Sequence, residues 1–379
     1  MIDKRLILEF REKVNENDFV LFKYRKNQKK NQWNCICSAM DWIIVASDYM
    51  NREDRDYTDS IEIYAYISSI DIIVEAIQQL HRVLFGTSKV LYLKARDIFT
   101  DNPFEQTDID YFKTIRACFG AHPVNLKEPG AKSDSEERRF ASWSGVDWES
   151  GKGYFSVILY SNQVDEDETE NKTENKTKDN IIINIAFEQL DAFLKKYYGH
   201  LKELMAEIDR QYTAYCLKMR DCSLHCEGDT LTQLRILQKE NSQRLDNSYY
   251  RYTLDRLVLF FETPVTCADN EALVNQYLEV LKLLVEEIKS NLQEMKLCDL
   301  KYGVLVHPQP SGLSATWTYL YEKFSNYDSA YPSNIWLSPM EKIFQDEFVF
   351  SYTTYNELYL LVHAALYRRL SRTAKWLLG

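Results

Sequence analysis

The chain has 379 residues, with 46 Lys and Arg against 57 Asp and Glu, so its formal net charge is −11. Hydrophobic residues make up 45% and aromatic residues 13% of it, which is enough for a sizeable core and excludes a wholly disordered chain. The 11 Gly and 8 Pro are few for this length, which disfavours collagen-like, β-sandwich and Gly-rich nucleotide-loop architectures. We therefore expect long helices in two domains or in one elaborated domain.

Targeting and redox features predict a cytoplasmic protein without membrane contact. Residues 1–14 are charged throughout and lack the apolar core of a signal peptide. No stretch reaches the roughly 18 apolar residues that a membrane span requires. The 8 cysteines are scattered, which in such a chain predicts reduced and mostly buried thiols.

The first half of the chain predicts helices at 33–50 and at 61–85. The second is the clearest, because Ile63, Ile67 and Ile70 belong to an apolar face that repeats every three or four residues, and Gly86 follows as a stop. Asp71 and Glu75 belong to a polar stripe beside that face. Such a stripe is a solvent-exposed face unless it points at an active site.

A further helix is predicted from residue 107 or 108 to residue 121. Pro123 limits it, because the residue before a proline is pushed out of the helical region, and so His122 lies at or just past its end. Segments 140–143 and 154–160 are β-prone and are separated by a Gly-containing loop, which predicts a hairpin.

The remainder of the chain predicts an acidic loop and then a second helical region. Residues 165–180 are low in complexity and strongly acidic, as an exposed loop at a domain boundary would be. From residue 181 onward the pattern is helical, with candidates at 231–262, 271–295, 340–352 and 356–378. The predicted fold is mainly α, with a helical domain and β-hairpin over 1–164, a loop over 165–180 and a helical domain over 181–379.

Most familiar catalytic motifs are absent from the sequence, including the P-loop, the His-Glu-x-x-His zinc motif, the Gly-x-Ser-x-Gly elbow and Cys-x-x-Cys pairs. Cys216, Cys222, His225 and Cys226 are metal-capable, but their spacing is irregular and the last two are adjacent. Buried thiols in a helical core are therefore favoured over a zinc site, and we predict neither a metal nor another cofactor.

Arg116 and His122 form the remaining constellation that could carry chemistry. Histidine transfers protons near neutral pH, and a guanidinium binds phosphate oxygens while keeping its charge. The alternative is a surface arginine followed by a histidine that the negative end of the helix dipole favours. Positions six apart do not share a helix face, so one chain makes a loose site that a two-fold pairing of these helix ends would complete.

Arg116 and His122, separated by five residues at the end of a helix, resemble the motif of the HEPN superfamily of ribonucleases. Segments 38–43, 112–126 and 140–143 are similar to uncharacterised bacterial proteins with such a domain, and the resemblance covers about residues 31–160. It implies a helical bundle that dimerises, with the Arg and His of both protomers in one cleft. Many members have a polar residue directly after the Arg, where this chain has Ala117.

The resemblance implies a metal-independent endoribonuclease that uses the ribose 2′-OH as nucleophile. His122 would be the general acid and base, and Arg116 would hold the scissile phosphate. Asp71 or Glu75 could supply a polar partner, and Lys113 and Lys127 could contact RNA, although they read equally well as ordinary surface lysines.

The resemblance further implies a toxin or an antiphage-defence effector, with RNA, a second copy of the chain, and an antitoxin or defence-system protein as partners. Two alternatives stay open. One is a non-catalytic dimerisation or sensor module, which Ala117 would suit. The other is an RNA-binding protein that does not cleave, whose affinity would depend strongly on salt.

Overall fold

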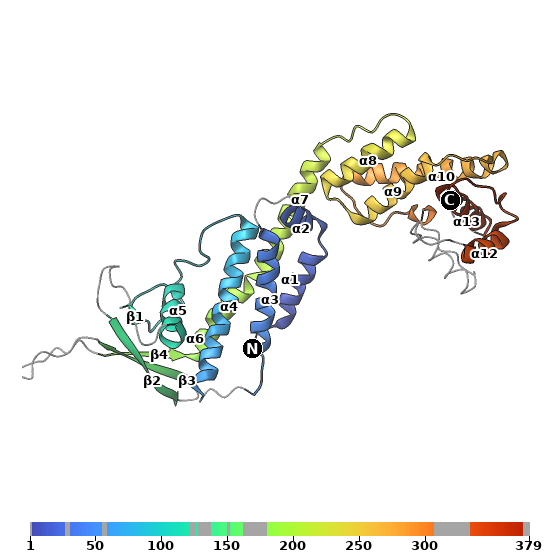
Figure 1. Ribbon diagram of the computed structural model, residues 1–379. Helices are drawn as coiled ribbons and strands as arrows, with labels where there is room; N and C mark the ends of the chain where they lie inside the picture. Colours follow the sequence, from blue (N-terminus) through green and yellow to red (C-terminus); the bar gives the residue numbers. More distant parts are fainter. Residues whose placement is uncertain are drawn as a thin grey trace, which may run out of the picture. The chain divides into compact units, whose positions relative to one another are not determined.

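The computed structural model describes residues 2–26, 31–54, 59–121, 126–127, 138–149, 152–161, 180–306 and 334–373. Over these residues the protein is mainly helical with one small antiparallel sheet, as the composition predicts (Figure 1). The chain divides into two compact units, Met1–Tyr212 and Thr213–Gly379.

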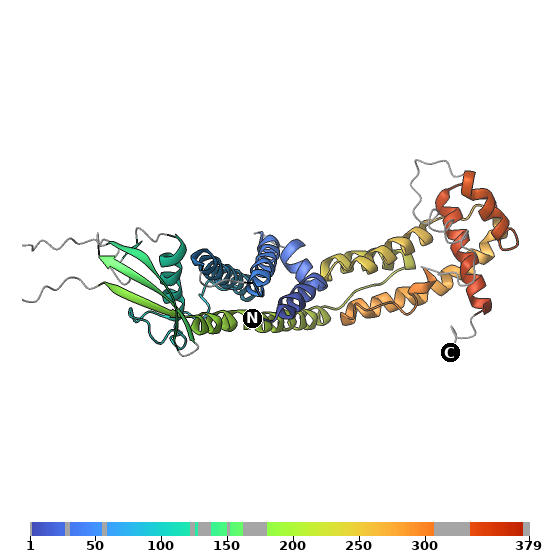
Figure 2. The ribbon, with the colours of Figure 1, turned by 90° about the horizontal axis from the view of Figure 1, so that it is seen from below.

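The helices of the first unit form a bundle. They are α1 (Lys4–Asn15), α2 (Asp18–Leu21), a π-helical turn η1 (Phe22–Lys26), α3 (Gln32–Met50), α4 (Ser60–Phe85), α5 (Asp108–Arg116), a π-helical turn η2 (Ala117–Ala121), α6 (Phe187–Gly199) and the first part of α7 (Leu201–Asp221). Gly86 ends α4 in the left-handed conformation, at φ 62°, as the sequence predicts. In Figure 2, α6 and the start of α7 follow one another almost in line.

The sheet lies at one end of this bundle (Figure 1). Its order is β1 (Leu126–Lys127), β2 (Arg138–Glu149), β3 (Lys152–Ser161) and β4 (Ile181–Ala186), and every neighbouring pair is antiparallel. The predicted hairpin is confirmed as β2 and β3, but its strands are longer than expected. Gly145 belongs to β2, at a shift in register, rather than to a loop.

Residues 181–186 are a strand, so the prediction of a helix there is wrong. β-Branched isoleucines dominate this segment. Ile182 and Asn184 are exposed, and they alternate with the buried Ile183 and Ile185. That alternation suits a half-buried strand beside β3, whereas a helix would scatter the same residues around its surface.

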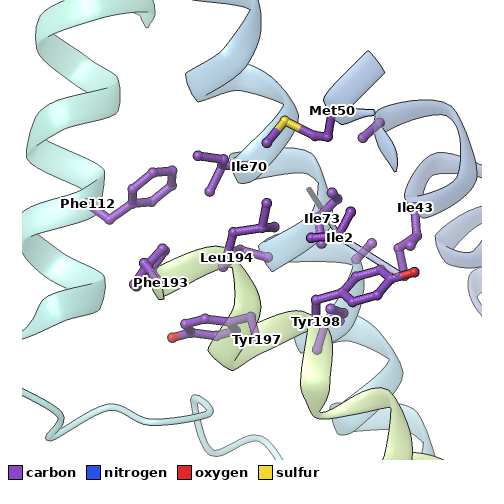
Figure 3. Packing of buried hydrophobic residues seen from close by; sticks show 14 of the residues in the cluster. Ile2, Ile43, Met50, Ile70, Ile73, Phe112, Phe193, Leu194, Tyr197 and Tyr198 are labelled. Carbon is purple, nitrogen blue, oxygen red and sulfur yellow. The ribbon is translucent and has the colours of Figure 1, made fainter. Parts of the chain in front are cut away.

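The predicted domain boundary also differs from the structure. Residues 181–212 belong to the first unit, because β4 completes the sheet and because α6 and α7 contribute Phe193, Leu194 and Leu204 to its core. Figure 3 shows Phe193 facing Phe112 of α5, close to Ile70 of α4, and the two phenyl rings lie 4.7 Å apart. The acidic segment lies outside the described residues apart from Asn180.

The second unit is helical in its described part, as predicted. It contains the end of α7 and then α8 (Thr230–Arg244), α9 (Ser248–Glu262), α10 (Ala268–Glu294), a 3₁₀ turn η3 (Gly303–Leu305), α12 (Asn334–Phe344) and α13 (Tyr355–Thr373). The single helix predicted over 231–262 is two helices. The chain turns at Asp246, where φ is 51°, and the Asn247 side chain caps α9 by accepting from the backbone N–H of Tyr250.

Candidate active site

Helix α5 positions the predicted arginine. Its side chains Ile109, Phe112 and Ile115 are buried in the core, which leaves Arg116 on the outer side of its last turn. Asp108 anchors the start of the helix, because its buried carboxylate accepts hydrogen bonds from the backbone N–H groups of residues 97–99. The end of α5 is therefore fixed by packing on one side and by a tethered loop on the other.

Arg116 forms an ion pair with Asp71 of α4, in which Nη1 donates to Oδ2 over 2.8 Å. The arginine side chain is 46% exposed and that of Asp71 is 28% exposed. Of the two acidic residues that the sequence offers as partners, the structure thus selects Asp71. Glu75 lies one turn further along α4 and accepts from Gln79 over 2.5 Å.

The guanidinium of Arg116 keeps most of its donors free. It carries five N–H donors, and one bond to Asp71 accounts for its contacts among the described residues. The remaining N–H groups face solvent on a half-exposed side chain and can bind the oxygens of a phosphate bidentately. Asp71 fixes where that charge stands and also offsets part of it.

Of the two lysines predicted to contact RNA, the structure describes the side chain of Lys113 but not that of Lys127. Lys113 is exposed and pairs with Asp110 on the same helix over 2.9 Å, and this bond lowers the pKa of Asp110. Lys127 belongs to β1, opposite Arg138 of β2, and its side chain lies outside the described part of the structure. Among the described side chains, no contact joins either lysine to Arg116.

The π-helical turn η2 carries the chain from Arg116 toward His122. Phe119 packs against Phe155 on the sheet, with the ring centroids 4.8 Å apart. Cys118 is buried, and burial raises the pKa of its thiol to about 12, which makes it an unreactive core side chain. His122 follows this turn and lies outside the described residues, so the structure places the arginine of the predicted pair without its histidine.

A second polar cluster, which sequence reasoning missed, lies in the same unit. His81 Nδ1 of α4 is 3.1 Å from Nε2 of His200, which stands between α6 and α7. Glu203 Oε2 lies 2.9 Å from Nδ1 of His200, although the angle there is not that of a hydrogen bond. No sequence periodicity links His81 to a residue 119 positions away.

Aromatic side chains surround the two histidines, including Phe85 at 4.6 Å from the His81 ring and Tyr92 at 6.0 Å from that of His200. Burial is the main reason why the pKa of His81 and that of His200 lie below the usual value, although Glu203 opposes the shift in both. Two neutral imidazole rings can form a hydrogen bond across the 3.1 Å gap, with one ring donating and the other accepting. The cluster is thus a hydrogen-bonded core contact whose outer ring, His81, is half-buried.

The metal-capable residues of the second unit do not form a common site. Cys216 and Cys226 are buried, whereas Cys222 and His225 are exposed. Among the described residues no group of three or more His, Cys, Asp and Glu is arranged to hold a metal ion. Across the chain three of the free cysteines are buried, so the prediction that most of the thiols would be buried is wrong.

His363 of the second unit also has a defined environment. It is fully buried in α13, and its Nδ1 donates to the Tyr359 carbonyl over 2.8 Å. Also within the described part, no helix is both long enough and apolar enough to cross a membrane.

Comparison with known proteins finds no matching family model, no matching curated protein and no matching solved structure.

Proposed function

We propose that the chain is a metal-independent endoribonuclease whose site combines Arg116 and His122 at a pairing of two chains. The observation that supports it best is the half-exposed guanidinium at the end of α5, held by Asp71 and left with most of its donors free. The proposed helical bundle is of the HEPN type, and the described fold of the first unit is compatible with it.

In the proposed reaction, His122 removes the proton from a ribose 2′-OH, and the oxygen attacks the adjacent phosphorus. The P–O2′ bond forms as the P–O5′ bond breaks, and the leaving oxygen receives a proton from an imidazolium. The products are a 2′,3′-cyclic phosphate and a 5′-hydroxyl. Arg116 binds the non-bridging oxygens and stabilises the charge that develops on them.

Asp71 acts in this proposal as a positioning residue. Its bond to Nη1 fixes the direction of the guanidinium, so that less conformational freedom is lost when a phosphate binds. Because single chains offer only one Arg and one His in a loose arrangement, the second copy supplies the groups that close the site. A role as a toxin or antiphage effector, restrained by a partner protein, belongs to the same proposal.

A specific observation also favours a second candidate, a non-catalytic dimerisation or sensor module. Asp71 offsets the charge of Arg116, and the residue that follows the arginine is Ala117 rather than a polar one. Both features weaken phosphate binding relative to an unpaired arginine. An RNA-binding protein that does not cleave lies between these two candidates, because it would keep the phosphate contact and lack the reaction.

The test is RNA cleavage by purified protein in EDTA, comparing wild type with Arg116→Ala and His122→Ala. The chain offers matched controls. Arg11 pairs with Asp41 over the same 2.8 Å at 42% exposure, and His225 is an exposed histidine of the second unit. We expect Arg116→Ala and His122→Ala to abolish cleavage, and Arg11→Ala and His225→Ala to retain it.

Two outcomes would overturn the assignment. If RNA stays intact with wild type on several substrates, the non-catalytic candidate replaces the ribonuclease. If all variants cleave equally, the activity belongs to other residues or to a contaminant. Circular dichroism and the mass of the assembly must be unchanged in each variant for the comparison to count.

A further inference from the structure

The sheet of the first unit has one buried face and, among the described residues, one face whose side chains are mostly half-buried or exposed. Phe155, Val157 and Leu159 of β3 and Ile183 and Ile185 of β4 point into the core. Since successive side chains of a strand alternate between faces, the residues between them lie on the opposite face. There Phe140 is 41% exposed, Tyr160 is 40% exposed and Ile182 is 59% exposed.

The two aromatic residues are neighbours on this outer face. Phe140 of β2 is the direct register partner of Tyr160 of β3, which sets their Cβ atoms about 5 Å apart. Neither ring stacks on another aromatic side chain of the described residues. The two partly exposed rings thus stand side by side on adjacent strands, where both can stack on unpaired bases.

An arginine, Arg138, accompanies the two rings on the outer face, two residues before Phe140 on β2. Arg138 is half-buried, no carboxylate in the described part of the structure pairs with it, and its Nη1 is buried without a hydrogen-bond partner. Lys127 is its register partner on β1. The acidic residues of β2, Asp147 and Glu149, belong to the opposite end of the strand, where their register partners are Tyr154 and Lys152.

We propose that this outer face, centred on Phe140, Tyr160 and Arg138, is a binding platform for single-stranded RNA. Exposed aromatic rings stack on bases of any sequence, and a basic side chain beside them takes the phosphate. An A-form duplex keeps its bases stacked on one another and so cannot use the rings. The occupant that fits both the rings and the charge is an unpaired strand.

The platform rests on the proposed function and extends it by naming how substrate is held. It is continuous with the Arg116 segment along the chain, because β1 begins five residues after the end of η2. Five residues span at most about 18 Å, which fixes an upper limit on the distance from that turn to the β1 edge of the sheet. A strand that leaves the platform at this edge therefore emerges close to the proposed site.

The experiment is fluorescence anisotropy with a labelled single-stranded RNA of about 12 nucleotides, the size that such surfaces cover. The full-length His122→Ala chain is the background, so that binding is measured without cleavage. We expect Tyr160→Ala and Phe140→Ala each to weaken binding roughly tenfold. Tyr160→Phe should restore the affinity, and Trp42→Ala, which removes a larger exposed aromatic residue from α3, should leave it unchanged.

Salt dependence separates the two kinds of contact. Arg138→Gln should lower the slope of log Kd against log salt concentration by about 0.7, the value for one phosphate contact to a single strand. Tyr160→Ala should leave that slope as it is. Because an alanine could disturb the strands, Tyr160→Leu and Phe140→Leu serve as variants that keep the apolar bulk and remove the stacking face.

The inference is overturned if the leucine variants bind like the background, if Trp42→Ala weakens binding equally, or if duplex RNA of the same length binds as tightly. It is also overturned if the sheet variants change the mass of the assembly instead of the RNA affinity, since the face would then be an interface between copies. Failure of the proposed reaction is separate. Binding through the sheet without cleavage by wild type keeps the platform and removes the nuclease.

Discussion

Two arginines, one in each unit, differ in how their charge is used. In the second unit, Arg244 is 2% exposed and donates to the carbonyls of Met219, Cys222 and Leu292. In the first unit, Arg116 is half-exposed and has one carboxylate partner. A buried arginine whose donors are taken up by backbone carbonyls and a carboxylate holds a fold together, whereas an arginine with free donors is available to a ligand.

Carboxylates show the same contrast. Glu357 of the second unit is fully buried and accepts hydrogen bonds from the backbone and hydroxyl groups of Thr266 and Thr353. Asp71 of the first unit keeps 28% of its side chain exposed beside the arginine it orients. Full burial with every hydrogen-bonding atom paired therefore marks scaffold residues, whereas partial exposure with unpaired donors or acceptors marks candidates for function.

The largest effect is expected from Arg244→Met. The change leaves three carbonyl groups and the Glu240 carboxylate without their donor, and should lower the free energy of unfolding of the second unit by about 3 kcal/mol or more. Urea denaturation measures it. Arg235→Met on the same helix is the control, because that arginine is 53% exposed and its loss should change little. Equal effects of the two changes would remove the distinction drawn above.

A smaller loss, about 2 kcal/mol at neutral pH, is expected from Glu357→Gln, because the amide replaces one carboxylate acceptor with a donor that faces threonine donors. The hydrogen bonds from Thr266 and Thr353 outweigh desolvation and hold the pKa of Glu357 below its usual value. The carboxylate therefore contributes stability above its unfolded pKa and loses that contribution as pH falls through the folded pKa.

The difference between wild type and Glu357→Gln should accordingly shrink when urea denaturation is repeated at decreasing pH below about 4.5. A difference that stayed constant across this range would show that the carboxylate charge has no part in the stability of the second unit. The amide substitution would then act through packing alone.

An effect on pH dependence is expected from the histidine pair of the first unit. Burial lowers the pKa of His81 and of His200, so the unfolded chain binds protons at a higher pH than the folded one. Stability is thus fully present above about pH 6.5 and falls as pH decreases toward the folded pKa values. His81→Gln should flatten this decline between pH 7.5 and pH 5.5 by about 1 kcal/mol or less. An unchanged profile would contradict a shared titration of the two rings.

The smallest stability effect is expected at the proposed site itself. Arg116→Ala and Asp71→Asn break one half-exposed ion pair, and each should change the free energy of unfolding by about 1 kcal/mol or less. Thermal unfolding measures this as a shift of a few degrees at most. If Arg116→Ala lowered the free energy of unfolding as much as Arg244→Met, Arg116 would be a scaffold residue and not a residue of a functional site.

Local patterns predicted much of the fold. The apolar repeat of α4, its stop at Gly86 and the β-prone run that became β3 follow from short-range sequence periodicity, and all are confirmed. The strand at 181–186 was missed because four isoleucines are compatible with either a buried helix or a strand. What decided it was pairing with β3, which is a long-range contact.

The sequence likewise predicted one residue of the candidate site but not its contacts. Arg116 was found from its motif, but the choice of Asp71 over Glu75 depends on how α5 crosses α4, which no residue pattern encodes. The pairing of His81 with His200 has the same origin, since the two rings meet only when α4 packs beside the junction of α6 and α7. Spatial neighbours far apart in the sequence are what the sequence alone could not supply.

The most direct measurement is the rate of RNA cleavage in EDTA by Arg116→Ala and by Arg11→Ala, each compared with wild type at unchanged melting temperature. These two arginines have the same 2.8 Å bond to a carboxylate and nearly the same exposure, 46% and 42%. We predict a loss of about a hundredfold or more for Arg116→Ala and none for Arg11→Ala. Cleavage at the wild-type rate by Arg116→Ala would contradict the central claim that the end of α5 is a functional site.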